Sequence, residues 1–256
     1  MADYKRQFDV FVCGGSQHVA LLRPLLERLL PYGTVHLASC FLSRSDLARL
    51  RGLYDVLHTP AHSPEGYTNF ELFVIRDINR LAAAPYFVKL DADVQLAPDW
   101  VEYVEGCVAA HPEAVLFGPR GGSVDVNFRL SGALVRRLLG RDLRVTNARK
   151  VIGGFYVGKT SFFKEHRRLM DVVHEFMWCF RGGVRYRPGI NPDGWPPPAQ
   201  EESLGPVEMT EGSPRFQGNE DTLRSLVVHA AGAGGRLHVI DGGGRVRIYR
   251  GGTMNP

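Results

Sequence analysis

Two aspartates, Asp91 and Asp93, stand one residue apart at the end of an apolar stretch that begins at Tyr86, and these residues are the best suited to chemistry. Two carboxylates this close repel each other unless a positive charge offsets them. Carboxylate oxygens suit a hard divalent cation, Mg²⁺ or Mn²⁺, which in turn binds phosphate oxygens. The pair therefore predicts a metal-assisted phosphate site. The alternative is an Asx-rich turn before a helix, since Pro98 follows and proline favours a first helical turn.

The elements around these aspartates follow a pattern that is typical of an α/β fold. The apolar run that ends at Asp91 predicts a central strand covered on both faces, and open α/β sheets bind ligands beyond the carboxyl ends of such strands. Strands are expected over residues 8–13, 34–41 and 54–59, with helices over 19–29, 45–53 and 69–84 between them. This alternation predicts a parallel sheet with right-handed crossovers.

The second half of the chain has a less regular pattern. Helices are expected over residues 98–110, 133–139, 161–180 and 218–230, and strands over 114–117, 124–130, 150–157, 237–240 and 246–249. The last two strands are expected to lie around the glycine turn at residues 242–244. One long stretch, residues 182–217, is rich in proline and shows no clear element, which indicates a functional lid or a disordered segment.

A glycine turn follows the first expected strand. The absence of side chains at Gly14 and Gly15 would let a ligand approach the backbone closely. Ser16 is expected to cap the helix that follows, and Pro24 is expected to kink or divide that helix.

Four motifs in this order resemble the GT-A glycosyltransferases, and among them the large inverting family 2. The matching segments are Arg76-Asp77, the Asp-x-Asp motif Asp91-Ala92-Asp93, Pro98-Asp99-Trp100 and the acidic segment Gly218-Asn219-Glu220-Asp221. The resemblance implies a Rossmann-like mixed α/β sheet flanked by helices in one domain, residues 1–256. Residues 1–118 would bind the nucleotide-sugar and residues 119–256 the acceptor, with residues 182–217 as the lid.

The same resemblance implies a role for individual residues. Asp91 and Asp93 would hold Mn²⁺ or Mg²⁺ and the nucleotide, and His238 is a weak candidate for a third metal ligand. Gly14, Gly15 and Arg76 would line the nucleotide-sugar site. Asp221 would take the proton of the acceptor hydroxyl, Glu220 would assist, and attack from the opposite face would invert the anomeric centre.

Two other functions remain open at this point. Gly14-Gly15-Ser16 with Arg23-Pro24-Leu25 is similar to the opening of sugar-1-phosphate nucleotidyltransferases, although Gln17-His18-Val19 stands where that family has further Gly, Thr and Arg residues. A catalytically silent nucleotide-sugar-binding module is the third possibility. Acidic residues are also favoured at any helix N-terminus, so Glu220 and Asp221 have a structural explanation as well.

Charge and composition indicate the kind of partner. The net charge is +4, yet residues 191–221 hold seven acidic residues and one basic residue, so the rest of the chain is strongly basic. A basic body suits an anionic donor such as a UDP- or GDP-sugar, and no nucleic-acid motif is recognised. The acidic lid suggests a cationic acceptor, such as an amino sugar or aminocyclitol. The polar start and the lack of a 20-residue apolar stretch predict a soluble, cytoplasmic protein with no membrane span.

Overall fold

The computed structural model describes the chain in separate segments. These are residues 7–15, 18–39, 42–59, 77–119, 126–130, 136–137, 139–148, 151, 154–170, 220–239, 246–250 and 253–255. For residues 126–130, 146–148, 220–223, 238–239, 246–250 and 253–255 only the backbone is described. Arg76, the predicted lid at 182–217 and most of the predicted helix at 69–84 lie outside these segments.

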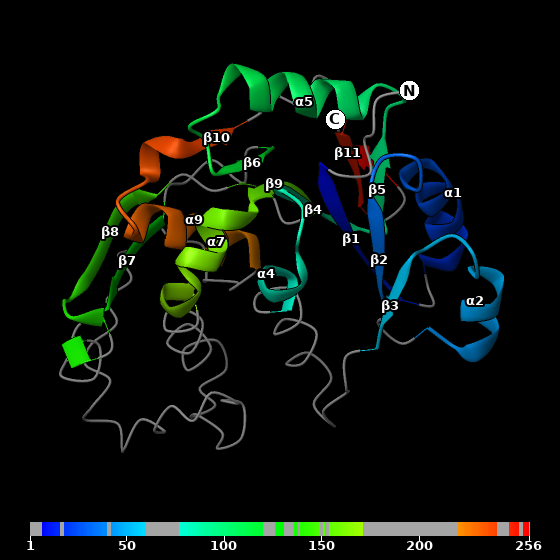
Figure 1. Ribbon diagram of the computed structural model, residues 1–256, viewed down its shortest axis with the longest axis horizontal. Coiled ribbons are helices and arrows are strands. Elements are labelled where there is room, and N and C mark those ends of the chain that lie inside the picture. The colour runs from blue at the N-terminus through cyan, green and yellow to red at the C-terminus, as the bar shows by residue number, and fades with distance from the viewer. Residues whose placement is uncertain are drawn as a thin grey trace.

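The largest unit in the described part of the chain is a seven-stranded sheet with the order β10-β6-β9-β4-β1-β2-β3 (Figure 1). Its strands are β1 (Phe8–Gly14), β2 (Thr34–Ser39), β3 (Val56–His58), β4 (Tyr86–Asp91), β6 (Leu116–Gly118), β9 (Phe155–Lys159) and β10 (Leu237–Val239). The strand that ends at Asp91 is central, as its continuous apolar run predicted.

The sheet is mixed in direction. β1 runs parallel to β2 and β4, and β2 runs parallel to β3, which is the arrangement that the strand–helix alternation predicted. β9 is antiparallel to both β4 and β6, and β10 returns parallel to β6. A mixed α/β sheet flanked by helices is therefore confirmed.

Six α-helices and one 3₁₀ helix in the described segments surround the sheet. They are α1 (Val19–Leu29), α2 (Arg44–Arg49), α4 (Ile78–Leu81), α5 (Trp100–Ala110), α7 (Thr160–Glu165), α9 (Glu220–Ala230) and η5 (Gly234–Arg236). α1 buries Leu22, Leu26 and Leu29, which recur at helical spacing on one side. Ser43 caps α2, where it forms a capping box with Asp46.

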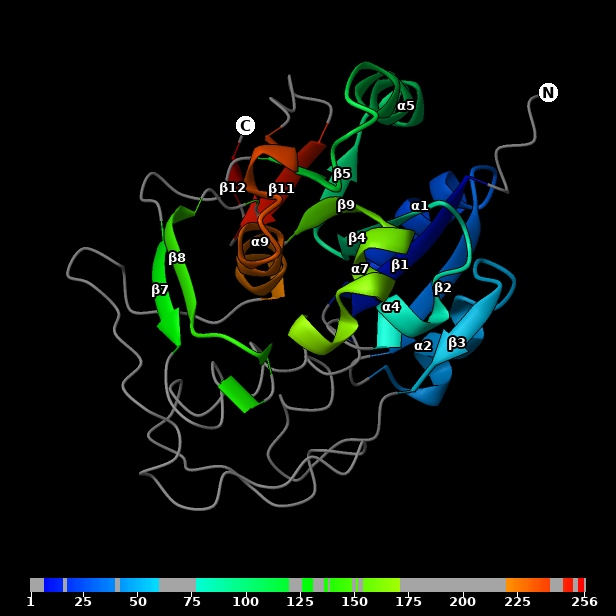
Figure 2. The ribbon, with the colours of Figure 1, turned by 60° about the vertical axis from the view of Figure 1, so that its left-hand side comes forward.

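The two faces of the sheet carry separate cores, because successive residues of a strand point to opposite sides. On one face, Val12, Val88 and Leu90 pack with residues of α1 and α5. On the other face, Phe11 and Phe87 pack with residues of α4, α7 and α9. Figure 2 shows α4 and α7 in front of the sheet and α1 behind it.

Two small sheets complete the described structure. β5 (Val94–Leu96), β11 (Val246–Arg250) and β12 (Thr253–Asn255) form one, and β7 (Val126–Leu130) and β8 (Leu143–Ala148) form the other. The two closing strands expected around the glycine turn exist but belong to different sheets. β10 pairs with β6, whereas β11 pairs with β5, directly after Asp93. Pairing partners so distant in sequence could not be inferred from the local pattern.

Three helix predictions need correction. α1 is continuous through Pro24, since buried leucines on both sides of the proline hold its two halves against the sheet. Its N-cap is His18 and not Ser16. The long helix expected from residue 161 ends at Glu165, and residues 167–170 form a separate helical turn. None of the described helices is both long enough and apolar enough to cross a lipid bilayer.

Candidate functional site

The carboxyl end of β4 is held from both sides by neighbouring backbone. The N–H of Asp91 donates to the carbonyl of Gly154, and the N–H of Ala92 donates to the carbonyl of Cys13, each at 2.9 Å. A tight turn at Ala92 and Asp93 then leads into β5. The two predicted carboxylates therefore project from a backbone that the sheet fixes in place, at the edge where α/β sheets bind ligands.

Asp91 is already paired with a cation of the chain itself. The ammonium of Lys89 lies 2.6 Å from Asp91 Oδ1, and the two residues are on the same face of β4 because they are two positions apart. The Lys89 side chain is 1% exposed, whereas that of Asp91 is 39% exposed. A lysine this deeply buried requires such a partner, because an unpaired charge in the interior is very costly. The aspartate thus has a second role, as the counter-ion of Lys89.

Asp93 differs from Asp91 in its surroundings. Its Oδ1 is buried and has no hydrogen-bond partner in the described part of the structure. A buried carboxylate oxygen without a partner is unfavourable, and it is the kind of atom that a bound cation or ligand satisfies. Of the two aspartates expected to bind metal, Asp93 is therefore the one with a buried oxygen that has no partner among the described residues.

The carboxylates fit a divalent cation, with phosphate oxygens completing its coordination. Within the described segments, no three His, Cys, Asp or Glu side chains come together as a metal site. Asp93, with the exposed part of Asp91, supplies hard oxygen donors of the type that Mg²⁺ and Mn²⁺ prefer. Mg²⁺ commonly uses one or two carboxylates together with substrate phosphates in this way.

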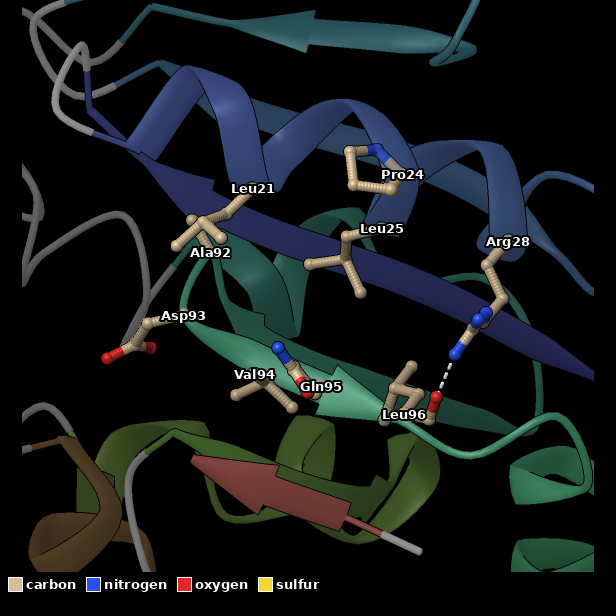
Figure 3. Close-up of a pocket in the computed structure, with 9 residues that line it drawn as sticks. All are labelled: Leu21, Pro24, Leu25, Arg28, Ala92, Asp93, Val94, Gln95 and Leu96. Atoms are coloured by element: carbon tan, nitrogen blue, oxygen red, sulfur yellow. Dashed lines mark hydrogen bonds between the residues drawn. The ribbon is translucent and has the colours of Figure 1, made fainter. Parts of the chain in front are cut away.

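A groove of about 280 Å³ lies between α1 and β5, next to Asp93 (Figure 3). Its lining residues are Leu21, Pro24, Leu25, Arg28 and the segment from Ala92 to Leu96. Arg28 stands at one end and donates to the carbonyl of Leu96, while Asp93 stands at the opposite end with its carboxylate turned away from Arg28. The walls between them are mostly apolar, and the groove is on the α1 side of the sheet, opposite the face that carries Lys89 and Asp91.

Gly14 has a packing reason to be glycine. A Cβ placed there would lie 2.9 Å from two side-chain carbons of Leu22 and 3.0 Å from Cβ of Ala92. The missing side chain thus lets α1 and the turn after β4 approach β1 closely. Gly15 follows outside the strand, and its carbonyl accepts from the N–H of His18 at 2.8 Å.

The predicted acidic motif begins α9, as the sequence indicated. Glu220 and Asp221 form the first two positions of this helix, and their side chains lie outside what the structure describes. One turn further on, Arg224 is 0% exposed and anchors the helix. Its Nε donates to the Tyr156 hydroxyl at 2.9 Å, and its NH1 group donates to Asn79 Oδ1 at 2.8 Å.

Aromatic rings enclose the guanidinium of Arg224. The rings of Phe87, Tyr156 and Phe163 have their centroids 4.8, 5.3 and 4.9 Å from its central carbon. The Tyr156 ring also lies 5.8 Å from the Lys89 ammonium. Lys89, Tyr156 and Arg224 therefore connect the end of β4 to the helix that carries Glu220 and Asp221.

Sequence reasoning missed these three residues, although two of them had a visible signal. Lys89 interrupts an otherwise apolar strand, and Arg224 precedes the buried run from Leu226 to Val228. A charged residue in an apolar pattern indicates a buried ion pair or a buried hydrogen-bonding network. Tyr156 carried no such signal, because tyrosine is common in strands.

His238 lies far from the aspartates in the strand order. It is on β10, which β6 and β9 separate from β4, and its side chain lies outside the described structure. Three strand spacings place the two backbones roughly 14 Å apart. We therefore leave His238 out of the ligand set proposed below.

No protein-family model matches this sequence, and no curated protein matches it. Several solved glycosyltransferase structures resemble it weakly. GlyE from Streptococcus pneumoniae TIGR4 has a TM-score of 0.46 and 9% identity, over 92% of this chain and 46% of the other. TarS from S. aureus, in complex with UDP-GlcNAc, has a TM-score of 0.39 and 9% identity, over 63% and 47% of the two chains.

A third similar structure is the mannosyltransferase PcManGT from Pyrobaculum calidifontis in complex with GDP-Man and Mn²⁺. Its TM-score is 0.40 and its identity 14%, over 64% of this chain and 47% of the other. The part of each of these three proteins that matches is about half of its length. Likeness at this level does not by itself establish an activity, so the assignment depends on the residues at the end of β4.

Proposed function

We propose that this chain is a metal-dependent glycosyltransferase, which moves a sugar from a nucleotide-diphospho-sugar to a hydroxyl of an acceptor. The observation that carries the proposal is the pair of carboxylates at the end of the central strand. One of them, Asp93, has a buried oxygen with no partner among the described residues. A bound divalent cation would satisfy that oxygen and would stabilise the charge on a departing diphosphate.

The remaining roles follow from where the elements lie. Asp93 is the proposed principal ligand of Mn²⁺ or Mg²⁺, and Asp91 lies beside it. Arg224 fixes the start of α9 against β9 and α4, so the backbone of Glu220 and Asp221 has a defined position. We assign Asp221 as the base that takes the acceptor proton and Glu220 as its neighbour in an inverting reaction.

Donor and acceptor are proposed by chemical class. The donor is a UDP- or GDP-sugar, which agrees with the basic charge of the chain outside residues 191–221. The acceptor is a small molecule or saccharide, and the acidic residues of the predicted lid favour a cationic one, such as an amino sugar or aminocyclitol. Replacing Glu201, Glu202, Glu208 and Glu211 by glutamine should then weaken acceptor binding.

Asp93→Asn provides the main test. The amide keeps the size of the side chain but is a poor ligand for Mn²⁺, so release of nucleoside diphosphate from UDP- or GDP-sugars should fall by about 100-fold or more. Asp142→Asn is the matched control, because Asp142 is exposed and pairs with Arg136 in a different part of the structure. Normal turnover by Asp93→Asn would contradict the proposal. Pyrophosphate formation from a nucleoside triphosphate and a sugar-1-phosphate would instead identify a nucleotidyltransferase.

A further inference from the structure

Lys89 is a buried lysine next to the candidate metal site, and two carboxylates can bind a metal ion without such a residue. Its ammonium is 2.6 Å from Asp91 Oδ1, and its side chain is 1% exposed. Its backbone pairs with Phe11 of β1 on one side and with Tyr156 of β9 on the other. The backbone of Lys89 is therefore fixed in the sheet, and the buried side chain holds its charge next to Asp91.

Lys89 acts on a ligand only through Asp91. A side chain with 1% exposure is closed off from a ligand in the site, whereas Asp91, with 39% exposure, is open to one. We therefore treat Lys89 as a positioning residue and not as a binding residue. Its effect is electrostatic: it cancels one of the two negative charges that Asp91 and Asp93 would otherwise present to a cation.

The consequence concerns the order in which ligands bind. Affinity for a hard cation rises with the number of negatively charged ligands around it. Lys89, Asp91 and Asp93 together carry a formal charge of −1, whereas the two carboxylates alone would carry −2, and the smaller charge makes a weaker site for a free divalent cation. A nucleotide diphosphate supplies the missing negative charge and the missing oxygen donors.

We propose that Lys89 makes binding of the divalent cation depend on the nucleotide, so that Mn²⁺ enters and leaves mainly as its complex with the diphosphate. The inference depends on the proposed function, because it assumes a metal–diphosphate site at Asp93. It adds a residue, Lys89, and a property, strong positive coupling between the two ligands. Such coupling is reciprocal, so Mn²⁺ must raise the affinity for nucleotide by the same factor.

The test measures binding of Mn²⁺ alone and in the presence of UDP or GDP, by electron paramagnetic resonance of the free ion. Lys89→Met keeps the length of the side chain and removes its charge. It should bind free Mn²⁺ about tenfold more tightly than the wild type and show a smaller gain when nucleotide is added. Tyr156→Phe is the matched control, because it alters the neighbouring hydrogen bond to Arg224 and changes no charge.

The outcomes separate this inference from the proposed function. If wild type binds Mn²⁺ with nucleotide but Lys89→Met binds free Mn²⁺ no more tightly than wild type, the role of Lys89 is wrong and the proposed function stands. If wild type binds no Mn²⁺ even with nucleotide, the proposed function fails, and the inference fails with it. Circular dichroism checks that the variant folds. If Lys89→Met does not fold, Lys89→Gln provides the same comparison, because glutamine is neutral and can still donate to Asp91.

Discussion

The two faces of the central sheet are built from the same strands but are held together in different ways. The face against α1 and α5 is mainly apolar, with Val12, Val88, Leu90 and Leu26 all fully buried. The face against α4, α7 and α9 also has a hydrophobic core, yet several buried polar side chains lie within it. These are Asp9, His36, Asn79, Lys89 and Arg224.

Each buried charge on the polar face is satisfied by a specific partner. The carboxylate of Asp9 accepts from the N–H groups of Ala83 and Ala84 and lies 3.8 Å from His36 Nε2. His36 Nδ1 is 3.0 Å from His58 Nε2. Asp91, which pairs with Lys89, also lies on this face of the sheet.

The two faces therefore have different roles in stabilising the fold and in positioning the candidate site. Apolar packing is tolerant of changes in shape, whereas a buried polar group is costly as soon as its partner is removed. The apolar face therefore supports the sheet, and the polar face holds the carboxylates and α9 in a defined arrangement. Replacing a buried polar side chain on the polar face should therefore cost more stability than exchanging one apolar side chain for another on the apolar face.

Arg224→Met should give the largest loss of stability. Methionine keeps the aliphatic part of the side chain but lacks the guanidinium, so it cannot donate to the Tyr156 hydroxyl or to Asn79 Oδ1. We expect the free energy of unfolding to fall by about 2–4 kcal/mol, measured by urea denaturation, because two buried acceptors lose their donor. A loss below about 1 kcal/mol would show that the polar face is not held by this network.

Asp9→Asn should have an intermediate effect that depends on pH. Burial raises the pKa of Asp9, but the nearby His36 imidazole and the hydrogen bonds from the N–H groups of Ala84 and Ala83 outweigh this effect, so the pKa lies below its usual value. The charged form therefore stabilises the fold at pH values above the unfolded pKa, about 4, and this contribution is lost as the pH falls through the lower folded value.

The measurement for Asp9→Asn is urea denaturation at pH 7 and at pH 3. At pH 7 the variant should be less stable than wild type by about 1–2 kcal/mol, because hydrogen bonds to a charged acceptor are lost. At pH 3 the difference should shrink. Asp142→Asn, on the surface, should show no comparable dependence, and a difference for Asp9→Asn that stays constant with pH would contradict the assigned charge state.

Leu26→Met should have the smallest effect. Leu26 is 0% exposed on the apolar face, and a hydrophobic replacement of similar volume usually costs less than about 1.5 kcal/mol. Urea denaturation alongside Arg224→Met compares the same new side chain on both faces. If Leu26→Met destabilised the protein as much as Arg224→Met, the contrast between the faces would not hold.

The sequence predicted the elements better than their arrangement. The apolar run before Asp91 and the apolar spacing of α1 are local signals, and the structure confirms both elements. The insertion of β9 antiparallel between β4 and β6 was not predicted, nor was the pairing of β11 with β5. Strand order depends on contacts between distant segments, which a local pattern does not record.

The candidate site shows the same distinction between local signals in the sequence and contacts that form only on folding. By itself the sequence identified Asp91 and Asp93 as candidates to bind a cation, because carboxylate oxygens suit a hard divalent cation. Only the tertiary structure decided that Asp91 is paired with Lys89 while Asp93 keeps a buried oxygen without a partner in the described residues. It also joined Arg224 to Asn79 across 145 residues of sequence. Residue type limits what a side chain can do, but its charge balance and its freedom to bind depend on the neighbours that folding places around it.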